Sequence, residues 1–386
     1  MFYSIFMTYM LPLIISVTIA SPFIYFADHV YRKYEELKKQ NDILYLTHKN
    51  IFHLNRKQSL PKININSLSS LSLIREHINH AVTFANNDFI FSTTFASDKS
   101  IFEAVQLSIS NGKRLRAGLA MDVAVHSSLN FNKNNAIHDA TEVALSLEYL
   151  HAASLIIDDM PHFDNDDTRR GQISTHKKYG PEIAQMAATS LSGLSLEGII
   201  YQVEQLKKYA INNLQLIQAN ETFGKLIGIL SNSISVKGAA GGQLAEMEII
   251  KNIANKTLIP NVETIENIIV RKTVSLFEAA ILSGWVVGTV FESNRELIGE
   301  QTKIIKEIAY HYGMAFQIAD DIGDVEKDNE NGHGNINIIN IIGLDKAQAR
   351  MEDELKLCKD KLIKLNLWSN VWDEAFEAAK NMSKSQ

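Results

Sequence analysis

The stretch Ile156 to Gly171, IIDDMPHFDNDDTRRG, ends an apolar run and places five aspartates in ten consecutive positions, directly before Arg169 and Arg170. Carboxylates this dense repel one another unless they are solvated or neutralised by cations. Hard divalent ions such as Mg²⁺ take oxygen ligands of this kind and share them with substrate phosphates. The two arginines suit the same phosphates, because a guanidinium binds an oxyanion through two parallel hydrogen bonds. The aspartates are Asp158, Asp159, Asp164, Asp166 and Asp167.

The spacing of these aspartates predicts a bend in the backbone. Asp158 and Asp164 are six residues apart, which would separate them by about 240° around a continuous helix. Pro161 lies between them and disfavours a helical conformation at Met160. We therefore expect a helix to end near Asp159 and a turn to follow. The alternative is a solvated acidic loop, because charge runs usually mark exposed faces.

A second cluster, Asp320, Asp321 and Asp324, lies in YGMAFQIADDIGDVEKD and again follows an apolar helical run. Asp320 and Asp324 are neighbours on one helical face, where like charges repel unless a cation lies between them. Two aspartate clusters on apolar helices, with cationic motifs nearby, predict two walls that face one metal and diphosphate site.

The order of the motifs resembles the trans-isoprenyl diphosphate synthases, also called polyprenyl synthetases, over roughly residues 70 to 350. Each motif alone is weak, but six in the family's order make a chance match improbable. They are NGKRLRAG (Asn111–Gly118), LEYLHAASLIIDDMPHFDNDDTRRG (Leu147–Gly171), THKKYG (Thr175–Gly180), GGQLAEM (Gly241–Met247), the Lys272–Thr273 pair and FQIADDIGD (Phe316–Asp324).

The resemblance implies an all-α, single-domain helical bundle, the isoprenoid synthase fold. It also implies a prenyltransferase that condenses isopentenyl diphosphate with an allylic prenyl diphosphate. Mg²⁺ is the expected cofactor, and a homodimer is the expected assembly. The hard oxygen ligands agree with Mg²⁺, because the sequence offers no cysteine ligands and no convincing histidine pair for Zn²⁺.

The resemblance also assigns roles to individual residues. The metal ligands are expected to be Asp158, Asp159, Asp164 and Asp320, with support from Asp321 and Asp324. Arg169, Lys272 and Thr273 are expected to contact the allylic diphosphate, and Gln243 and Gln317 are expected to lie near the metal ions and that substrate. The diphosphate of isopentenyl diphosphate is expected to rely on Lys113, Arg116, His151 and Arg170.

Taken without the resemblance, several of these residues have simpler interpretations. GKRLR is typical of a solvated basic patch, and a single histidine such as His151 is typical of a hydrogen-bonded core residue. If the segment were helical, Lys113 and Arg116 would share one face and offer two donors to one anion.

Product length in this family depends on the residue five positions before the first aspartate, where a bulky side chain stops growth early. This position is Ala153 and is followed by Ser154. We therefore predict a product longer than farnesyl diphosphate, namely geranylgeranyl diphosphate or a longer chain. The competing interpretation is that Ala153 is a small residue required for helix packing.

Several positions depart from the family pattern. The usual Gly-Asp after the first motif is Ala188-Thr189, the lysine after the second motif is Asn335, and the proline of the basic motif is Ala117. Glu246 replaces an aspartate, and Lys327 is a candidate for the missing charge. These departures keep open a catalytically weak partner subunit. A class I terpene cyclase is a third hypothesis, but it would not need the GKRLR motif.

Composition sets broader limits. The chain has 386 residues, 46% of them hydrophobic, and a net charge of −6, so nucleic-acid binding is not expected. The single cysteine, Cys358, excludes an internal disulfide and a CxxC metal site.

Residues 2–27 contain no charged side chain, and they are long enough to cross a bilayer, for which about 20 apolar residues suffice. We predict a transmembrane segment over 1–27, a polar linker over 28–66 and the catalytic domain over 67–386. The basic residues of the linker, including Arg32 and Lys33, follow the span and predict a membrane-anchored protein with its catalytic domain in the cytoplasm. A hydrophobic extension without a membrane role is the alternative.

Overall fold

The structure is a computed structural model that describes residues 69–88, 96–131, 139–330 and 336–384. These residues are almost entirely helical, which confirms the predicted all-α fold. The elements are α3 (Leu71–Asp88), α4 (Ala96–Ser110), α5 (Leu115–Phe131), α6 (Thr141–Asp158), β1 (Thr168–Arg169), β2 (Gln172–Ile173), α7 (Thr175–Tyr179), α8 (Pro181–Tyr209), α9 (Asn213–Ile234), α10 (Ala239–Ala254), α11 (Val262–Ile269), η3 (Val270–Val274), α12 (Ser275–Gly288), α13 (Arg295–Glu330), α14 (Ile339–Ile342), α15 (Leu344–Lys364) and α16 (Asn370–Met382).

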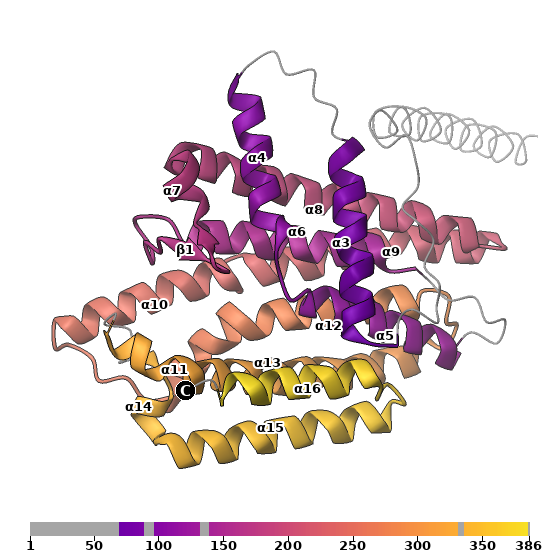
Figure 1. Cartoon of the computed structure of the whole chain (residues 1–386). Helices are drawn as coiled ribbons and strands as arrows, with labels where there is room; N and C mark the ends of the chain where they lie inside the picture. The colour runs from indigo at the N-terminus through magenta and orange to yellow at the C-terminus, as the bar shows by residue number, and fades with distance from the viewer. Residues whose placement is uncertain (1–68, 89–95, 132–138, 331–335, 385–386) are drawn as a thin grey trace, which may run out of the picture. The chain divides into compact units, whose positions relative to one another are not determined.

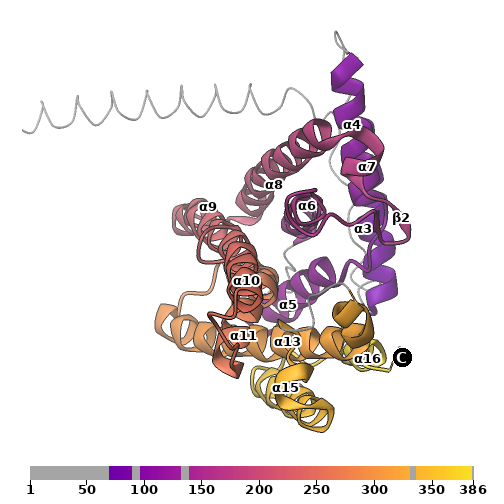
Figure 2. The same cartoon turned by 90° about the vertical axis from the view of Figure 1, so that its left-hand side faces the viewer.

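Helix α6, which carries the first aspartate motif at its end, is the central helix of the bundle. Thirteen of its 18 residues are buried, as expected for a helix that is apolar nearly all round. It packs against α8, α5, α3, α4 and α12. Figure 2 shows α6 nearly end-on, with α8 on one side and α5 below it.

The boundaries of α8 and α9 follow from local sequence. Pro181 occupies the first turn of α8, where its missing N–H costs nothing, after Gly180 at a φ of 87°. The side chain of Asn212 caps α9 by accepting a hydrogen bond from the backbone N–H of Gln215 at 2.9 Å.

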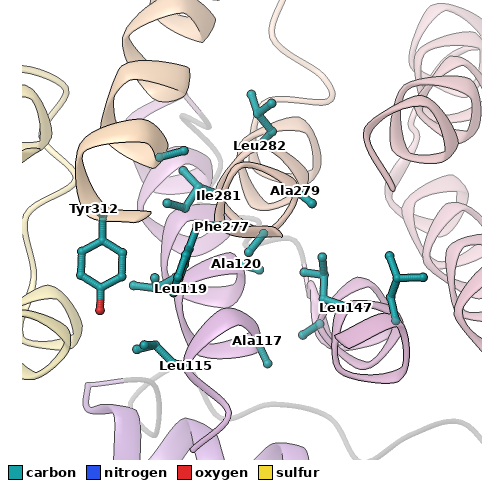
Figure 3. Close-up of a cluster of buried hydrophobic side chains, with 14 of the residues drawn as sticks. Leu115, Ala117, Leu119, Ala120, Leu147, Phe277, Ala279, Ile281, Leu282 and Tyr312 are labelled. Carbon is teal, nitrogen blue, oxygen red and sulfur yellow. The ribbon is translucent and has the colours of Figure 1, made fainter. Parts of the chain in front are cut away.

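Helices α5 and α12 pack unusually closely, because two glycines of α12 meet the backbone of α5. A Cβ atom on Gly284 would lie 2.2 Å from the carbonyl oxygen of Ala120, and one on Gly288 would lie 2.6 Å from that of Ala124. Figure 3 shows the apolar side chains of α5, α12 and their neighbours at this contact, with Phe277 beside Leu119. This contact holds the first residues of α5 next to the cavity described below.

Helix α13 spans 36 residues and carries the second aspartate motif. It packs against α12, η3, α15 and α16. Figure 1 shows α15 and α16 on the side of the bundle away from α8. The two aspartate motifs lie on α6 and α13, and α12 packs against both of these helices.

No helix within the described ranges is long and apolar enough to cross a membrane. The predicted membrane span at residues 2–27 and the predicted linker at 28–66 lie outside the described residues.

Candidate active site

A cavity of about 820 Å³ lies between the end of α6, the loop before α5, η3 and α13. Asp158 and Asp320 both line it, as the hypothesis of two facing acidic walls requires. Thirteen of the predicted site residues line the cavity: Lys113, Arg116, His151, Asp158, Asp164, Arg169, Arg170, Lys272, Thr273, Gln317, Asp320, Asp321 and Asp324.

The predicted bend brings Asp164 back to Asp158. Helix α6 ends at Asp158, and the backbone N–H of Asp164 then donates to the carbonyl oxygen of Asp158 at 2.9 Å. Gln243 donates from Nε2 to Oδ1 of Asp164 at 3.2 Å, which orients this carboxylate from α10. Gln243 thus acts on the acidic wall although it does not itself line the cavity.

Asp158 is a partly buried carboxylate, and the positive charge around it does not offset its loss of solvation. Burial raises the pKa of Asp158 to about 7, and the neighbouring carboxylates of Asp164 and Glu246 add to this, against Lys272 and Arg169. Oxygen ligands that are short of a cation are the donor set that suits Mg²⁺. The residues present therefore fit the predicted ion. In the described ranges, no three acidic, histidine or cysteine side chains are grouped so that they could hold a metal ion by themselves.

Asp159 has a different position from the one expected for a metal ligand. Its side chain is 2% exposed and does not line the large cavity. Instead it accepts a hydrogen bond from Nε of Arg169 at 2.7 Å, and Arg169 also pairs with Asp166 at 2.9 Å. The sequence could not show this, because Asp158 and Asp159 point in different directions from one helix end.

Arg169 and Arg170 lie on a short β-hairpin. Thr168 pairs with Ile173 and Arg169 with Gln172, so Arg170 and Gly171 form a two-residue turn. Both turn residues have positive φ, 53° for Arg170 and 73° for Gly171, as a type I′ hairpin turn requires. For Arg170, which is not a glycine, a positive φ is a less favourable backbone conformation. Its Nη1 donates to the carbonyl oxygen of Asn111. The hairpin thereby connects the first aspartate motif to the loop Asn111–Arg114 before α5, called the basic loop below.

The basic loop is held by a buried ion pair that the sequence did not reveal. Nη1 of Arg114 lies 2.9 Å from Oε2 of Glu148, and the two side chains are 1% and 3% exposed. Arg114 also donates to Oδ1 of Asn79 at 3.0 Å and to the carbonyl oxygen of Ile109. A charged residue on an apolar helix, such as Glu148 on α6, is the signal that might have indicated a buried partner.

Lys113 and Arg116 do not share a helical face, because α5 begins only at Leu115. Arg114, between them, has a φ of 52°. Lys113 therefore lies in the loop and Arg116 in the first helical turn, and both line the cavity.

Arg116 and His151 form the inner part of a cationic region. Nη1 of Arg116 lies 3.3 Å from Nε2 of His151, and its guanidinium lies 4.5 Å from the ring centre of Phe277. Burial lowers the pKa of Arg116 to about 10. Burial, reinforced by Arg116 and Arg170, lowers the pKa of His151 well below its usual value, so the histidine is neutral. Nε of Arg116 and Nδ1 of His151 are buried without a hydrogen-bond partner, as expected for groups that await an anion.

A π-helical turn, η3, carries Lys272 and Thr273 between α11 and α12. Such turns are rare and occur frequently at functional sites. Gly242 permits α10 to approach this turn, since a Cβ there would lie 2.8 Å from Cγ of Lys272 and 2.9 Å from its backbone nitrogen. Lys272 forms an ion pair with Glu246. Burial opposes protonation of Lys272, but Glu246 and Asp158 outweigh it and raise its pKa.

Ala153 is buried, with 6% exposure, and does not line the cavity, whereas its neighbour Ser154 does. The cavity face of α6 consists of Glu148, His151, Ser154, Leu155 and Asp158, at helical spacing. Residues that were not selected from the sequence also line the cavity, among them Arg75, Asn111, Glu148, Ile336 and Asn337.

The cavity of this helical bundle combines an acidic wall with a cationic region, a kind of site that can bind an anion both through metal ions and through basic side chains. The polyprenyl synthetase family model matches residues 98–336. The chain is 31% identical over 281 residues to a trans-prenyltransferase of African swine fever virus, covering 73% of this chain and 76% of the relative. It is 32% identical over 234 residues to a chloroplastic geranylgeranyl pyrophosphate synthase of Capsicum annuum, covering 60% of this chain and 54% of the relative.

A similar fold occurs in the geranyltransferase of Helicobacter pylori, whose structure is complexed with magnesium and isoprenyl diphosphate. The TM-score is 0.59 at 25% identity, and the alignment covers 84% of this chain and 100% of the other. The chain belongs to the polyprenyl synthetase family.

Proposed function

We propose that the protein is a trans-prenyltransferase that joins isopentenyl diphosphate to an allylic prenyl diphosphate. The observation that carries this proposal is the single cavity lined by Asp158 and Asp320 on its acidic side and by Lys113, Arg116 and Arg170 on its basic side. Two anionic substrates need two such regions, one that acts through metal ions and one that acts through cationic side chains.

The acidic side suits the allylic substrate. Asp158, Asp164 and Asp320 would hold Mg²⁺, which when bound supplies Lewis-acid neutralisation of the departing diphosphate. Lys272 is placed to pair with the same diphosphate once it exchanges Glu246 for a phosphate oxygen. Arg169 can make the same exchange, because its present partners Asp159 and Asp166 are also carboxylates.

The basic side suits isopentenyl diphosphate. Lys113, Arg116 and Arg170 line the same cavity as the neutral His151, whose unpaired Nδ1 and the unpaired Nε of Arg116 offer further hydrogen bonds. These fixed charges orient the second substrate so that its double bond attacks the allylic carbon, after which the released diphosphate accepts the proton. No protein nucleophile is required. The apolar residues Leu115, Leu155 and Leu276 of the cavity wall exclude water from the reacting carbons.

The proposed product is geranylgeranyl diphosphate or a longer trans-polyprenyl diphosphate. Ala153 and Ser154 are both small, and Ser154 lines the cavity, so neither closes the path of a growing chain. S154F should shorten the product, while A153F tests the residue selected by resemblance. If S154F and A153F both leave the product length unchanged, α6 does not set the chain length.

One assay separates the candidate functions. The full chain is incubated with Mg²⁺, radiolabelled isopentenyl diphosphate and farnesyl diphosphate, and the products are separated by chromatography. An acid-labile, longer prenyl product is expected. Absence of turnover would favour a partner subunit, and a released hydrocarbon would favour a terpene cyclase.

We also propose a homodimer that forms through α8 and α9. An exposed stripe on α8 contains Met186, Gly193 and Leu196, and one on α9 contains Gly224 and Gly228. A Cβ atom on any of the three glycines would meet no atom within 4 Å, so these faces are open to a second copy. Exposed apolar and small residues of this kind suit a symmetric contact. G224R should convert the dimer to a monomer in analytical ultracentrifugation, and an unchanged sedimentation coefficient would exclude this surface.

The predicted anchor at residues 2–27 completes the proposal, with the catalytic domain in the cytoplasm. An apolar segment of this length suits an enzyme whose product is a membrane lipid precursor. Alkaline extraction of membranes should leave the full chain in the pellet and release a chain that begins at Leu60. Protease added outside sealed cells should not cleave the catalytic domain.

A further inference from the structure

Three polar side chains on the cavity wall formed by η3 and α13 are joined in one hydrogen-bonded chain. Oγ1 of Thr273 donates to Oε1 of Gln317 at 2.6 Å. Nε2 of Gln317 then donates to Oδ1 of Asp321 at 2.8 Å. All three residues line the cavity, so the chain runs along its wall from the π-helical turn to the second aspartate motif.

Beyond Asp321 the same chain continues into the backbone before α14. The second carboxylate oxygen, Oδ2, accepts a hydrogen bond from the backbone N–H of Ile338 at 3.1 Å. Nδ2 of Asn337 donates to the backbone carbonyl oxygen of Asp321 at 2.8 Å, and Oδ1 of Asn337 accepts from the N–H of Ile339 at 3.0 Å. Asn337 is 2% exposed and Asp321 is 8% exposed, so these bonds are protected from water.

The chemistry of the carboxylate determines the direction of every bond in this chain. A carboxylate only accepts hydrogen bonds, so Gln317 must turn its NH₂ group toward Asp321 and its carbonyl oxygen toward Thr273. Thr273 must then donate its only hydroxyl proton to Gln317. While the chain is intact, Thr273 cannot donate to a phosphate oxygen, and only its lone pairs are available to a ligand.

We propose that Asp321 is a positioning residue that sets the orientation of Gln317 and Thr273, holds Asn337 at the cavity wall and fixes the backbone at Ile338. Both of its oxygens already accept bonds from protein donors, so a metal ion at Asp321 would have to displace them. This role differs from that of Asp320, its neighbour in the motif. The proposal deepens the proposed function, on which it depends only for the identity of the ligand.

The kinetic test is a double-mutant cycle between Asp321 and Thr273, which are joined through Gln317. Loss of one hydrogen bond to a charged group corresponds to about a tenfold effect or more. D321N and T273V should each lower kcat/KM for the allylic substrate about tenfold, with the KM for isopentenyl diphosphate changed less than about twofold.

The double variant D321N/T273V should be little worse than either single variant, and T273S should recover most of the loss caused by T273V. If the two single effects multiplied to about a hundredfold loss in the double variant, the coupling between Asp321 and Thr273 would be refuted. A matching rise in both substrate KM values would show that Asp321 supports the cavity only in a general way, which would also overturn the proposal.

Hydrogen–deuterium exchange of the full-length protein tests the Ile338 end of the hydrogen-bonded chain and requires no enzymatic turnover. The amide of Ile338 should exchange faster in D321N, because its acceptor is weakened, and should keep its protection in Q317A. D324N changes a carboxylate of the same motif outside the hydrogen-bonded chain and should leave this amide unaffected. Unchanged exchange of Ile338 in D321N would overturn the proposal even if the wild-type protein proved inactive with prenyl substrates.

Discussion

The buried ion pair between Arg114 and Glu148 should dominate the stability of the basic loop. The two side chains are 1% and 3% exposed, and Nη1 of Arg114 lies 2.9 Å from Oε2 of Glu148. R114M removes the charge and three donors while it keeps much of the side-chain volume. It leaves Glu148 as a buried charge without its partner, for which we expect a loss of about 3–5 kcal/mol in the free energy of unfolding. This is a large part of the roughly 5–15 kcal/mol that stabilises a typical domain.

Urea denaturation followed by circular dichroism measures this loss. The double variant R114M/E148L should recover most of the stability, because it removes both charges together. The matched control is K99A, which breaks a pair with Glu103 whose side chains are 74% and 44% exposed. An exposed pair of this kind contributes about 1 kcal/mol or less.

A loss below about 1 kcal/mol for R114M, similar to that of the exposed control, would refute the argument that burial makes this pair decisive. A double variant that is as unstable as the sum of its single variants would refute it as well. In active preparations, R114M should also raise the KM for isopentenyl diphosphate, because Arg114 lies between Lys113 and Arg116 in the sequence and its buried bonds anchor this segment.

Three further predictions concern packing, pH and metal. G284A forces a Cβ to within 2.2 Å of the carbonyl oxygen of Ala120 and should cost about 1–3 kcal/mol in thermal denaturation, whereas an unchanged melting temperature would show that α5 can move away. Burial alone would raise the pKa of Glu354, but hydrogen bonds from His311 and Arg350 outweigh burial and lower this pKa. The ionised carboxylate therefore stabilises the fold at pH values above its unfolded pKa of 4.5. This stabilisation is lost as the pH falls through the folded pKa. E354Q should therefore be less stable than the wild type at pH 7 and should lose less stability on acidification, and parallel pH curves would contradict this. Removal of divalent cations with EDTA should abolish turnover and added Mg²⁺ should restore it, and full activity in EDTA would exclude the metal-assisted mechanism.

The parts of the site that follow from local rules were predictable from the sequence. The proline at position 161 and the six-residue spacing of Asp158 and Asp164 predicted the bend that the structure contains. The mostly apolar sequence of α6 agrees with its central position in the bundle. The shared cavity of Asp158 and Asp320 was predicted from the presence of two aspartate clusters far apart in the sequence, not from a local pattern.

The remaining features depend on partners that are far apart in the sequence. Arg114 meets Glu148 across 34 residues, and Thr273 meets Gln317 across 44 residues. Spacing alone cannot choose such partners, because any of several charged or polar residues would satisfy the same chemistry. The different roles of Asp158 and Asp159 have the same origin, since the fold decides which neighbour faces the cavity and which faces Arg169.

The π-helical turn at Val270–Val274 has a consequence for the two helices that it joins. One residue more than an α-helical turn shifts the angular phase of everything that follows by about 100°. The isoleucines of α11, Ile265, Ile268 and Ile269, can therefore line the cavity. Gly284 and Gly288 of α12, further along the same continuous helix, face α5. Deletion of a single residue within the turn would rotate one face out of register with the other, so a shortened loop elsewhere in the protein should be tolerated far better than a shortened η3.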